Sequence, residues 1–436
     1  MLDYRSLLRE ARKVRFESGL TPLPEVELDE LRVSEASGRV IREPSADQRH
    51  CLFEDGLREL SKGGYALLIL SGGLATRVGI TFPKALLPIS PVRRKTLLQL
   101  HLEKVNRLCA LLGKDSVPPR VFILTSPFNH DSIEGYLESQ RFFGLDKRQV
   151  VLVMQGTAPC LTLDGNDFFP CPPAEDGSDS KVVEAPKGNG ALFEALAHCP
   201  EFMSQLENLR LLHVIAIDNA LSRPLDPELV GLALRCPGVE VLNKCVVRRG
   251  SEKVGVFCMG KAPRVVEYSE LEMLPDASFL QGTTRVYGNM CDHAFSGEFL
   301  RRIIEEQLFK QLPYHAANKV VSYYDQDEGR MVRPDAPNGY TLELFVFDVF
   351  QFASRVMCIE VDRDSQFAPV KNVADYNVYN ELSAQHRISR QSRNWLEAAG
   401  AELGEGFFEV SCLASYQGEG LERYRGARLE GPMYIE

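Results

Sequence analysis

Short apolar runs alternate with amphipathic stretches along the chain from about residue 65 onward. Apolar residues at helical spacing predict helices over residues 96–108 and 131–140. The runs that predict buried strands are residues 65–70, 121–124, 150–154 and 211–217. Because helices separate these strands, we expect an α/β fold with a mostly parallel sheet and helices on both faces.

The two ends of the chain have a different character. Tyr4, Leu7, Leu8, Ala11 and Val14 share one face at helical spacing, which predicts an N-terminal helix. A polar stretch rich in Pro, Gly, Ser and acidic residues predicts an exposed loop near residues 170–181. The chain turns helical again after about residue 377 and ends in a Gly-rich stretch that suits turns and short strands. We therefore expect a helical N-terminal accessory region (1–55), a central domain (56–377) and a small C-terminal domain (378–436).

Charge and cysteine usage narrow the function classes. The 436 residues include 50 Lys+Arg and 60 Asp+Glu, and 50 − 60 gives a net charge of −10. A diffuse acidic balance argues against binding nucleic acid or a membrane surface, since both need a basic footprint. The 11 cysteines form no CxxC pair, which favours free thiols in a reducing compartment. Since no apolar run resembles a signal core or a membrane span, we expect a cytoplasmic protein. We also expect a monomer or a weak homo-oligomer.

Polar and glycine residues follow each predicted strand directly. Ligands of open α/β sheets bind beyond the carboxyl ends of the strands, so these residues are expected to meet at one edge. They offer close backbone approach, hydroxyls, an amide and a carboxylate, which together are typical of a nucleotide site with a metal ligand. The residues are Ser71-Gly72-Gly73, Thr125-Ser126, Gln155-Gly156 and Asp218-Asn219.

The segment SGGLATRVGITFPK, residues 71–84, carries the most specific chemistry. It matches neither GxxxxGK[ST] nor GxGxxG. It is a Gly-rich turn after a buried strand, followed by Arg77 and Lys84, so backbone amides and two cations can hold phosphate oxygens. The alternative is an ordinary strand–loop–helix connection with surface cations. The fixed order of Arg and Pro-Lys behind the glycines favours phosphate binding.

The same segment resembles GGxGTRLGxxxPK, the signature of the sugar-1-phosphate nucleotidyltransferases. More narrowly, the chain resembles the eukaryotic-type UDP-N-acetylglucosamine pyrophosphorylases from about residue 65 to its end. Each further match alone is weak, and jointly they are specific. They are Arg94-Lys95-Thr96-Leu97 with Gln99, Phe143-Gly144-Leu145, Gln155-Gly156, Asp164-Gly165, Pro186 with Gly188-Asn189-Gly190, Asp218-Asn219, Val265-Val266-Glu267-Tyr268-Ser269-Glu270, Gly288-Asn289 with His293, Leu312-Pro313 with His315 and Lys319, Pro337-Asn338-Gly339, Phe345-Val346-Phe347-Asp348, Phe367 with Pro369, Lys371 and Asn372, and Gly418-Glu419-Gly420-Leu421-Glu422.

The resemblance implies a Rossmann-like, GT-A-like nucleotidyltransferase domain whose mixed sheet is flanked by helices and by small terminal domains. It also implies a reaction in which UTP and N-acetylglucosamine 1-phosphate give UDP-N-acetylglucosamine and pyrophosphate. An ionised sugar phosphate is already a nucleophile and needs no general base. Catalysis then depends on positioning and charge neutralisation for in-line attack on the α-phosphorus.

Each charged candidate has an expected role in that reaction. Arg77 and Lys84 stabilise the α-phosphate and the departing pyrophosphate, and Lys371 neutralises the incoming sugar phosphate. Asp218 is the expected ligand of Mg²⁺ or Mn²⁺, since hard cations prefer oxygen ligands, although an aspartate there could also cap a helix. His315 is expected to be structural, because the reaction demands no proton transfer.

The resemblance also implies which residues bind each part of the substrates. Nucleotide-binding residues are Gly72, Gly73, Ala75, Thr76, Gln155, Gly156, Gly188 and Asn189, with Gln155 and Gly188 near the uracil. Sugar-binding residues are Asn219, Gly255, Glu267 and Asn289.

Three departures from the family pattern leave alternatives open. Ala75 stands where the signature has its third glycine, Lys187 where an aspartate is common, and Val286 where an asparagine precedes Gly-Asn. The sugar could therefore be glucose or galactose rather than N-acetylglucosamine. A third alternative is a catalytically weak UDP-sugar-binding protein with a regulatory role.

Overall fold

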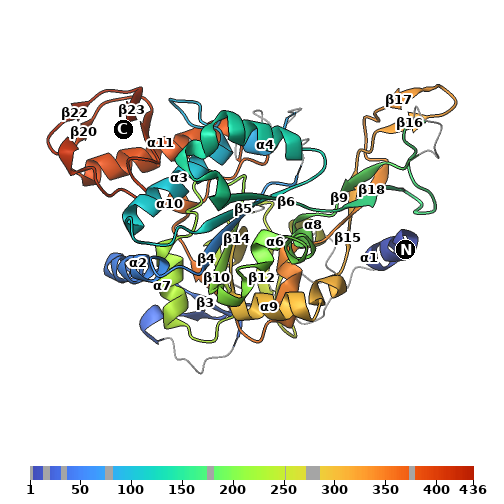
Figure 1. The fold of residues 1–436 in the computed structure, drawn as a ribbon, viewed down its shortest axis with the longest axis horizontal. Coiled ribbons are helices and arrows are strands. Elements are labelled where there is room, and N and C mark those ends of the chain that lie inside the picture. Colours follow the sequence, from blue (N-terminus) through green and yellow to red (C-terminus); the bar gives the residue numbers. More distant parts are fainter. Residues whose placement is uncertain are drawn as a thin grey trace.

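The computed structural model describes residues 3–12, 20–30, 37–73, 82–173, 181–250, 252–271, 285–372 and 379–436. Its centre is a large mixed sheet with helices on both faces (Figure 1). The order of strands across the sheet is β2 (Glu25–Val26), β3 (Arg39–Ile41), β19 (Val356–Glu360), β11 (Val241–Val247), β14 (Tyr287–Ser296), β10 (Leu211–Ala216), β4 (Tyr65–Leu70), β5 (Arg120–Thr125) and β6 (Val150–Met154). Beside this path lie β1 (Thr21–Pro22), β12 (Val256–Met259) and β13 (Pro263–Val266).

Parallel pairing dominates this sheet, but one central strand runs the other way. β14 is antiparallel to both of its neighbours, β10 and β11. The pairs β10–β4, β4–β5 and β5–β6 are parallel, so their carboxyl ends share one edge. The predicted mixed α/β sheet is confirmed, and its four predicted strands are β4, β5, β6 and β10.

Side chains of β4 alternate between two hydrophobic cores, as the two-residue period of a strand requires. Leu67 and Ile69 enter the core under α2, α3, α4 and α7, whereas Ala66 and Leu68 enter the core under α5, α6 and α9. The helices are α1 (Tyr4–Arg12), α2 (Ala46–Leu60), α3 (Leu97–Leu112), α4 (His130–Ser139), α5 (Leu192–Ala197), α6 (Pro200–Met203), α7 (Pro227–Arg235), α8 (Tyr268–Leu271), α9 (Gly297–Glu305), α10 (Arg363–Gln366) and α11 (Glu381–Ala398). The 3₁₀ turns are η1 (Leu28–Glu30), η3 (Lys84–Leu86), η4 (Arg141–Gly144), η5 (Lys147–Gln149), η6 (Asn189–Ala191), η7 (Leu206–Asn208), η9 (Leu308–Gln311), η10 (Val346–Phe352) and η11 (Glu422–Tyr424).

An arm of short strands extends from the sheet, on the right in Figure 1. The N-terminal helix α1 packs against this arm, where Leu8 is buried with Leu161 and Leu342 and Arg12 lies over the Tyr340 ring. The arm consists of β8 (Leu161–Thr162), β15 (His315–Lys319) and β18 (Gly339–Glu343), the pair β7 (Thr157–Pro159) and β9 (Glu184–Pro186), and the hairpin β16 (Tyr323–Asp325) and β17 (Arg330–Val332).

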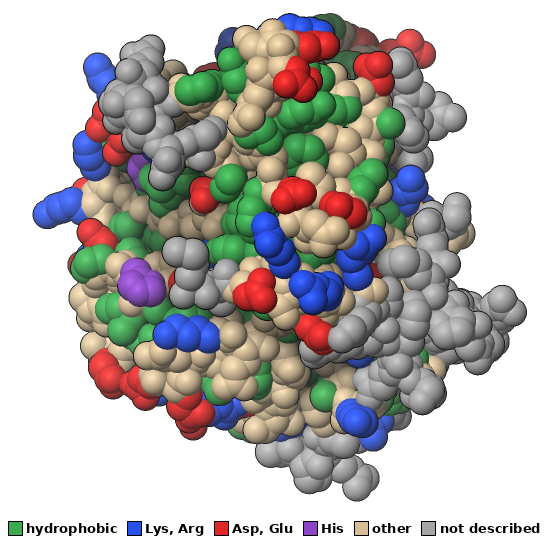
Figure 2. Space-filling model, turned by 90° about the vertical axis from the view of Figure 1, so that its right-hand side faces the viewer, with side chains coloured by type: hydrophobic (Ala, Val, Ile, Leu, Met, Phe, Trp, Pro, Cys, Tyr) green, Lys and Arg blue, Asp and Glu red, His purple; other side chains and the backbone are tan. Residues whose placement is uncertain are grey.

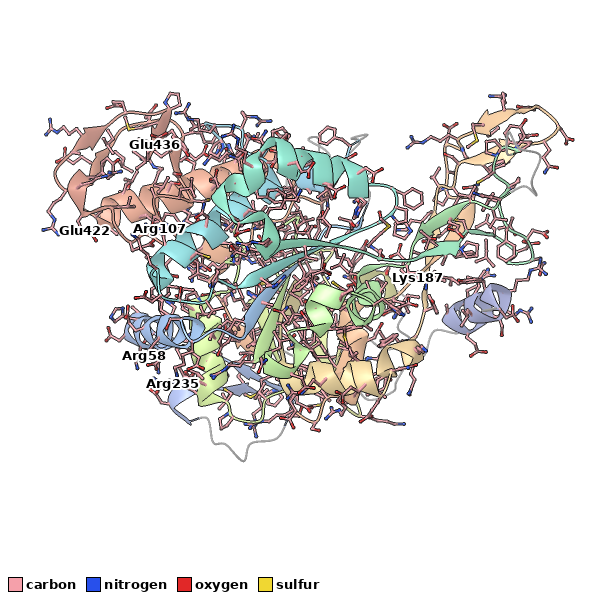
Figure 3. The ribbon with its side chains drawn as sticks, viewed as in Figure 1. Arg58, Arg107, Lys187, Arg235, Glu422 and Glu436 are labelled. Atoms are coloured by element: carbon pink, nitrogen blue, oxygen red, sulfur yellow. The ribbon has the colours of Figure 1, made fainter. Side chains whose placement is uncertain are left out.

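The C-terminal module, at the upper left in Figure 1, has a small core of its own. It comprises α11, β20 (Glu402–Leu403), β21 (Phe408–Val410), β22 (Arg428–Leu429) and β23 (Met433–Ile435). It docks on the segment that leads into α3. The buried carboxylate of Glu409 accepts hydrogen bonds from the backbone N–H groups of Val92 (2.8 Å) and Arg93 (2.9 Å). Arg107 of α3, which faces the module in Figure 3, donates to Glu419 (2.9 Å).

The first 55 residues do not form helices alone, because they also supply β2, an edge strand of the central sheet, and β3, which lies between β2 and β19. The proposed boundaries at residues 55 and 377 stay predictions. No helix among the described residues is long and apolar enough to cross a membrane.

Candidate functional site

Two turns at neighbouring strand ends bring a cation and a carboxylate together. β4 and β10 are parallel partners, with Leu70 opposite Ala216, so the segments that follow them leave the sheet at the same edge. The Nζ atom of Lys84 lies 3.4 Å from Oδ2 of Asp218, and each side chain is 19% exposed. The predicted phosphate-binding lysine and the predicted metal ligand are therefore adjacent and open to a ligand.

Asn219 fixes the turn that carries Asp218. Its Oδ1 accepts from the N–H of Ala368 and its Nδ2 donates to the carbonyl of Gln366, both at 2.7 Å. The N–H of Val370 donates to the Asp218 carbonyl (2.9 Å). These bonds join Asp218 to the segment after α10 that carries Lys371. The buried Asn219 amide makes these hydrogen bonds to backbone atoms, so it holds the turn in place. The expected contact of Asn219 with the sugar stays a prediction.

Two side chains of α3 hold the same turn from beneath. Lys104 Nζ donates to the carbonyls of Ala220 (2.9 Å) and Ser222 (2.8 Å), and burial lowers the pKa of Lys104 to about 8. His101 Nε2 lies 3.2 Å from the carbonyl of Ile217, and burial lowers the pKa of His101 to about 3. We did not expect either role. The only indication of these roles in the sequence is that both residues lie on the apolar face of the helix predicted over residues 96–108.

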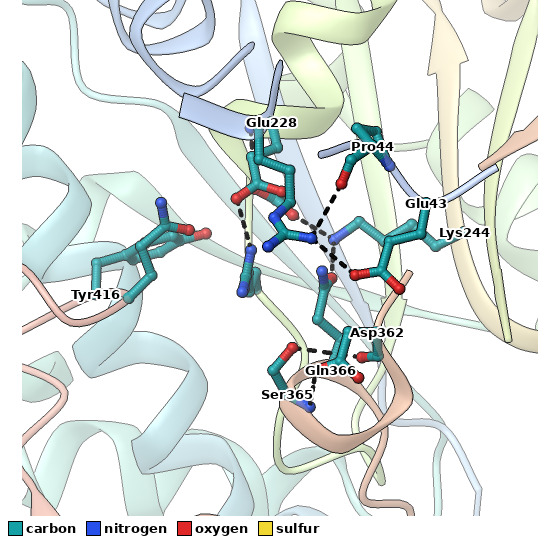
Figure 4. Close-up of polar contacts among 12 residues, drawn as sticks. Glu43, Pro44, Glu228, Lys244, Asp362, Ser365, Gln366 and Tyr416 are labelled. Carbon is teal, nitrogen blue, oxygen red and sulfur yellow. Dashed lines mark hydrogen bonds and ion pairs between the residues drawn. The ribbon is translucent and has the colours of Figure 1, made fainter. Parts of the chain in front are cut away.

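A buried ion network around Lys244 and Gln366 (Figure 4) is linked to Asn219 through Gln366. Lys244 Nζ donates to Asp226 Oδ2 (2.5 Å) and to Gln366 Oε1 (2.9 Å). Gln366 is also the residue whose backbone carbonyl accepts from Asn219. Removing one member of a buried ion pair leaves its partner uncompensated, so this network is a rigid support for the turn.

The side chain of Gln155 lies directly against Gly72. A Cβ atom on Gly72 would lie 1.8 Å from Nε2 of Gln155, so only glycine admits this amide. Gln155 is 3% exposed, and its Oε1 atom has no hydrogen-bond partner among the described residues. Buried side-chain oxygens are rarely left without a partner, and this one is free to accept a hydrogen bond from a ligand.

A second loop faces the same region. Gly188 has φ +92°, and its Cβ position lies 2.6 Å from the carbonyl oxygen of Leu344, so both conformation and space require glycine. Lys187 lies at the base of the arm (Figure 3), and its N–H donates to the Gly156 carbonyl (3.1 Å). Asn189 Oδ1 accepts from the N–H of Val346 (2.9 Å). The Gly156 turn and the Gly188 loop, both predicted to bind the nucleotide, are thus bonded to each other.

The predicted sugar-binding residues form another wall of the site. A Cβ on Gly255 would lie 3.1 Å from Oε1 of Glu267, and the Gly255 carbonyl accepts from the Asn289 N–H (2.8 Å). Burial raises the pKa of Glu267, and the Lys371 ammonium opposes that rise. Half-buried Cys291 has φ +57° and donates its N–H to Asn289 Oδ1 (2.8 Å).

The thiol of Cys291 marks where the predicted residues converge. Burial raises the pKa of this thiol, the charges of Asp218 and Glu267 raise it further, and the charge of Lys371 lowers it. Its Sγ also lies 3.9 Å from Nδ2 of Asn189. The site therefore has a cysteine near its centre, a position to which we had assigned no role.

The predicted residues Ala75, Thr76 and Arg77 lie outside the described residues, so their roles stay predictions. Among the residues that the structure describes, no group of three or more His, Cys, Asp or Glu side chains is arranged so that it could hold a metal ion. The chemistry of Asp218 still fits Mg²⁺, which commonly takes one or two carboxylates and completes its shell with phosphate oxygens and water.

The protein's net negative charge makes the cations of the site a local feature. On the face that carries the arm, Lys and Arg side chains are intermingled with Asp and Glu and with hydrophobic side chains (Figure 2). Lys84, by contrast, lies beside Asp218, and the Lys371 charge acts on Glu267 and Cys291. Short-range contacts rather than a broad basic surface would therefore hold an anionic ligand.

Comparison with known proteins places this geometry among sugar-nucleotide enzymes. The family model described as UTP–glucose-1-phosphate uridylyltransferase matches residues 44–413. The chain is 32% identical over 380 residues to the UDP-N-acetylglucosamine pyrophosphorylase of Saccharomyces cerevisiae. The matched region covers 85% of this chain and 78% of the yeast protein. It is 33% identical over 416 residues to the human UDP-N-acetylhexosamine pyrophosphorylase-like protein 1, covering 88% of this chain and 79% of that protein.

A solved structure shares the fold. The uridine diphosphate N-acetylglucosamine pyrophosphorylase from Trypanosoma brucei, in complex with an inhibitor, superposes with a TM-score of 0.76 at 24% identity. The superposition covers 99% of this chain and 89% of that one.

Proposed function

Because the chain belongs to the UTP–glucose-1-phosphate uridylyltransferase family, we propose that it transfers a uridylyl group from UTP to N-acetylglucosamine 1-phosphate. The products are UDP-N-acetylglucosamine and pyrophosphate. The observation that carries the proposal is the pairing of Lys84 with Asp218 at the shared edge of β4 and β10. Relatives that match most of the chain are named for N-acetylglucosamine or N-acetylhexosamine, which favours an N-acetylated sugar.

The bond changes define what the site must do. An oxygen of the sugar 1-phosphate attacks the α-phosphorus of UTP, while the bond from that phosphorus to the oxygen bridging to the β-phosphate breaks. Pyrophosphate leaves with the electron pair of that bond. No proton moves, so the side chains must align the two phosphates and neutralise charge.

The side chains of the chain divide this work. Lys84, with Arg77, neutralises the departing pyrophosphate, and Lys371 neutralises the incoming phosphate. Mg²⁺ or Mn²⁺ held by Asp218 and by phosphate oxygens would supply further charge neutralisation. The unpartnered Oε1 of Gln155 is suited to accept a hydrogen bond from the uracil N3–H group.

The wall of the site that contains Glu267 and Asn289 would select the sugar. Glu267 and Asn289 are suited to contact the sugar, since the Glu267 carboxylate lies beside Gly255 and Asn289 is hydrogen-bonded to both Gly255 and Cys291. The N–H and carbonyl of an N-acetyl group offer these side chains a donor and an acceptor that a plain hydroxyl arranges differently. This is the part of the site where glucose and N-acetylglucosamine would be told apart.

The test is a substrate panel with the purified full-length chain. Pyrophosphate release is measured with UTP and Mg²⁺ or Mn²⁺ and with the 1-phosphates of N-acetylglucosamine, glucose and galactose in turn. We expect the highest kcat/KM with N-acetylglucosamine 1-phosphate and loss of activity on chelation. Asp218→Asn keeps the shape of the side chain and should abolish the metal response while retaining the fold. A higher kcat/KM with glucose or galactose would contradict the sugar assignment, and binding of UDP-sugar without turnover would indicate a binding protein.

A further inference from the structure

Residues from three motifs, none of which has itself been given a role in the proposed reaction, meet at one histidine. Glu270 lies in α8, His315 begins β15, and Asp348 lies in η10. His315 Nδ1 lies 2.8 Å from Glu270 Oε1, and His315 Nε2 lies 2.8 Å from Asp348 Oδ2. All three side chains are at most 24% exposed, and the imidazole lies against the ring of Phe345, with the ring centroids 4.4 Å apart.

The geometry settles the protonation of the ring. A neutral imidazole carries one N–H and can donate to one carboxylate, and its other nitrogen would place a lone pair against an ionised oxygen. With a carboxylate at each nitrogen, the ring carries both protons and a positive charge. Although burial opposes that charge, the hydrogen bonds to Asp348 and Glu270 raise the pKa of His315 to about 10.

The carboxylates of Asp348 and Glu270 lie in two segments that differ in how firmly the hydrophobic core anchors them. η10 is anchored in a hydrophobic core, where Val346, Val349 and Phe350 are at most 1% exposed. α8 is a single turn of four residues. The bond from Asp348 through His315 to Glu270 therefore ties a one-turn helix to a rigid segment.

The same helical turn positions Glu267. The N–H of Glu270 donates to the Glu267 carbonyl (2.9 Å), and the second carboxylate oxygen of Glu270 accepts from the Glu267 N–H (3.3 Å). Glu267 belongs to the wall assigned to the sugar, and the Lys371 charge acts on its carboxylate. A change in the position of Glu270 is therefore passed directly to Glu267.

We propose that His315 is a positioning residue that clamps α8 to η10 through Glu270 and Asp348 and thereby sets Glu267 for recognition of the sugar. The proposal rests on the proposed function, since it assigns Glu267 to the sugar moiety of a UDP-sugar. It predicts an effect on the sugar and little effect on the nucleotide, because Gln155 and Gly188 are held by other contacts.

The test compares the affinities of UDP-N-acetylglucosamine and UDP, measured by calorimetry on the full-length chain. His315→Gln keeps a donor but removes the charge and one of the two bonds. We expect this variant to raise the Kd of UDP-N-acetylglucosamine about tenfold or more, because the free energy of a charged hydrogen bond and of its coupling corresponds to a change of that size. The Kd of UDP should stay within about threefold of the wild-type value. Arg330→Gln, which breaks an exposed ion pair on the same arm, should leave both Kd values unchanged.

A double-variant cycle separates positioning from a general loss of structure. If His315 acts through Glu267, then His315→Gln combined with Glu267→Gln weakens UDP-N-acetylglucosamine binding no more than Glu267→Gln alone. In kinetics, His315→Gln raises KM for the sugar 1-phosphate and leaves KM for UTP nearly unchanged. Additive losses, or equal losses for UDP and UDP-N-acetylglucosamine, would overturn the proposal.

A second variant covers the case in which His315→Gln does not fold. Glu270→Ala keeps the His315–Asp348 pair and releases only α8, so the same sugar-selective loss is expected. Failure of the proposed function gives a different result, because UDP and UDP-N-acetylglucosamine would then bind the wild-type chain equally well. If the wild type prefers UDP-N-acetylglucosamine and Glu270→Ala keeps that preference, the clamp is excluded while the proposed function stands.

Discussion

The ammonium of Lys84 lies 3.4 Å from the carboxylate of Asp218, across the shared edge of two parallel strands. This separation exceeds the 2.7–2.9 Å or so of a tight charged hydrogen bond. Each side chain retains access to solvent, so neither fully satisfies the other. A phosphate placed at this edge can therefore meet the lysine, and a metal ion held by Asp218, as proposed, would add to the neutralisation of its charge.

Lys84→Ala is the first variant that follows from this pair. We expect kcat to fall about 100-fold or more while the Kd of UDP-N-acetylglucosamine rises less than tenfold, because the lysine acts on charge that develops as pyrophosphate departs. Steady-state kinetics and calorimetry on the same preparation give both values. Lys147→Ala, which removes an exposed lysine paired with Glu138, should change neither. Equal losses in kcat and in affinity would show that Lys84 stabilises the ground state as much as the transition state.

Gly72 and Gly73 are adjacent but should differ in their tolerance of a methyl group. In Gly72→Ala the new methyl would overlap the Gln155 amide, whereas a Cβ on Gly73 meets no atom of the described residues within 4 Å. We expect Gly72→Ala to lower the melting temperature and to weaken UTP binding about tenfold or more, since overpacking displaces a buried amide at a cost of about 1–3 kcal/mol. Gly73→Ala should keep the wild-type melting temperature, so any loss of UTP affinity there reports direct contact with the nucleotide. An unchanged melting temperature in Gly72→Ala would contradict the packing described here.

The predicted site was accessible from the sequence because its members follow the strands directly. β4 and β6 have the bounds that their apolar runs predict, and the run over 211–217 corresponds to β10. Placing the ends of these three strands at one edge was enough to select Gly72, Gln155 and Asp218 as candidates. Strand β14 was missed. Its ten residues include Asn289, Asp292 and His293, which are polar yet buried, and such residues interrupt the apolar pattern of a central strand.

The supports of the site could not be predicted, for a physical reason. Lys104 bonds to backbone carbonyls 116 and 118 residues away, and Lys244 bonds to a glutamine 122 residues away. Local periodicity carries no information on such pairings. The signal that remains is a charged residue on an apolar face, which marks burial without naming the partner.

Glu409 provides a test of how the C-terminal module is held to the catalytic core. Glu409→Ala removes the acceptor of two backbone N–H groups and should cost about 1–3 kcal/mol of unfolding free energy. Glu409→Gln retains a carbonyl oxygen that can accept both bonds and should cost less. The matched control is Glu402→Ala, which breaks an exposed pair with Arg428 and should have almost no effect. Urea unfolding gives the comparison, and equal losses in Glu409→Ala and Glu402→Ala would contradict a structural role for Glu409.

His315 and Lys104 should change the free energy of unfolding in opposite directions as the pH rises. The hydrogen bonds to Asp348 and Glu270 outweigh burial and raise the pKa of His315 from 6.5 to about 10, which holds the imidazole charged. The Arg264 charge favours the ionised form of both carboxylates. The folded state therefore binds the proton more tightly than the unfolded state does. Its contribution is complete below pH 6.5 and is lost as the pH rises towards 10.

Burial acts in the other direction on Lys104, whose pKa falls from 10.5 to about 8. Between these values the unfolded state holds the proton and the folded state has released it, so stability rises with pH. A neutral amine has two N–H donors, and the structure supplies two acceptors, the carbonyls of Ala220 and Ser222. The deprotonated form of Lys104 is therefore fully bonded in the folded state.

The two effects can be separated by comparing each variant with the wild type, because other groups titrate over the same interval. The measurement is the free energy of unfolding in urea at pH 6.5, 8 and 10. From pH 6.5 to 8, the deficit of His315→Gln relative to the wild type should shrink by at most about 1.4 kcal/mol per pH unit. From pH 8 to 10, the deficit of Lys104→Met should grow, since the wild type gains stability there that the variant lacks. If the deficit of His315→Gln were constant with pH, the imidazole would not be charged by its two carboxylates. If the deficit of Lys104→Met shrank, the lysine would be charged in the folded state, and the turn that carries Asp218 would be held by an ammonium rather than by an amine.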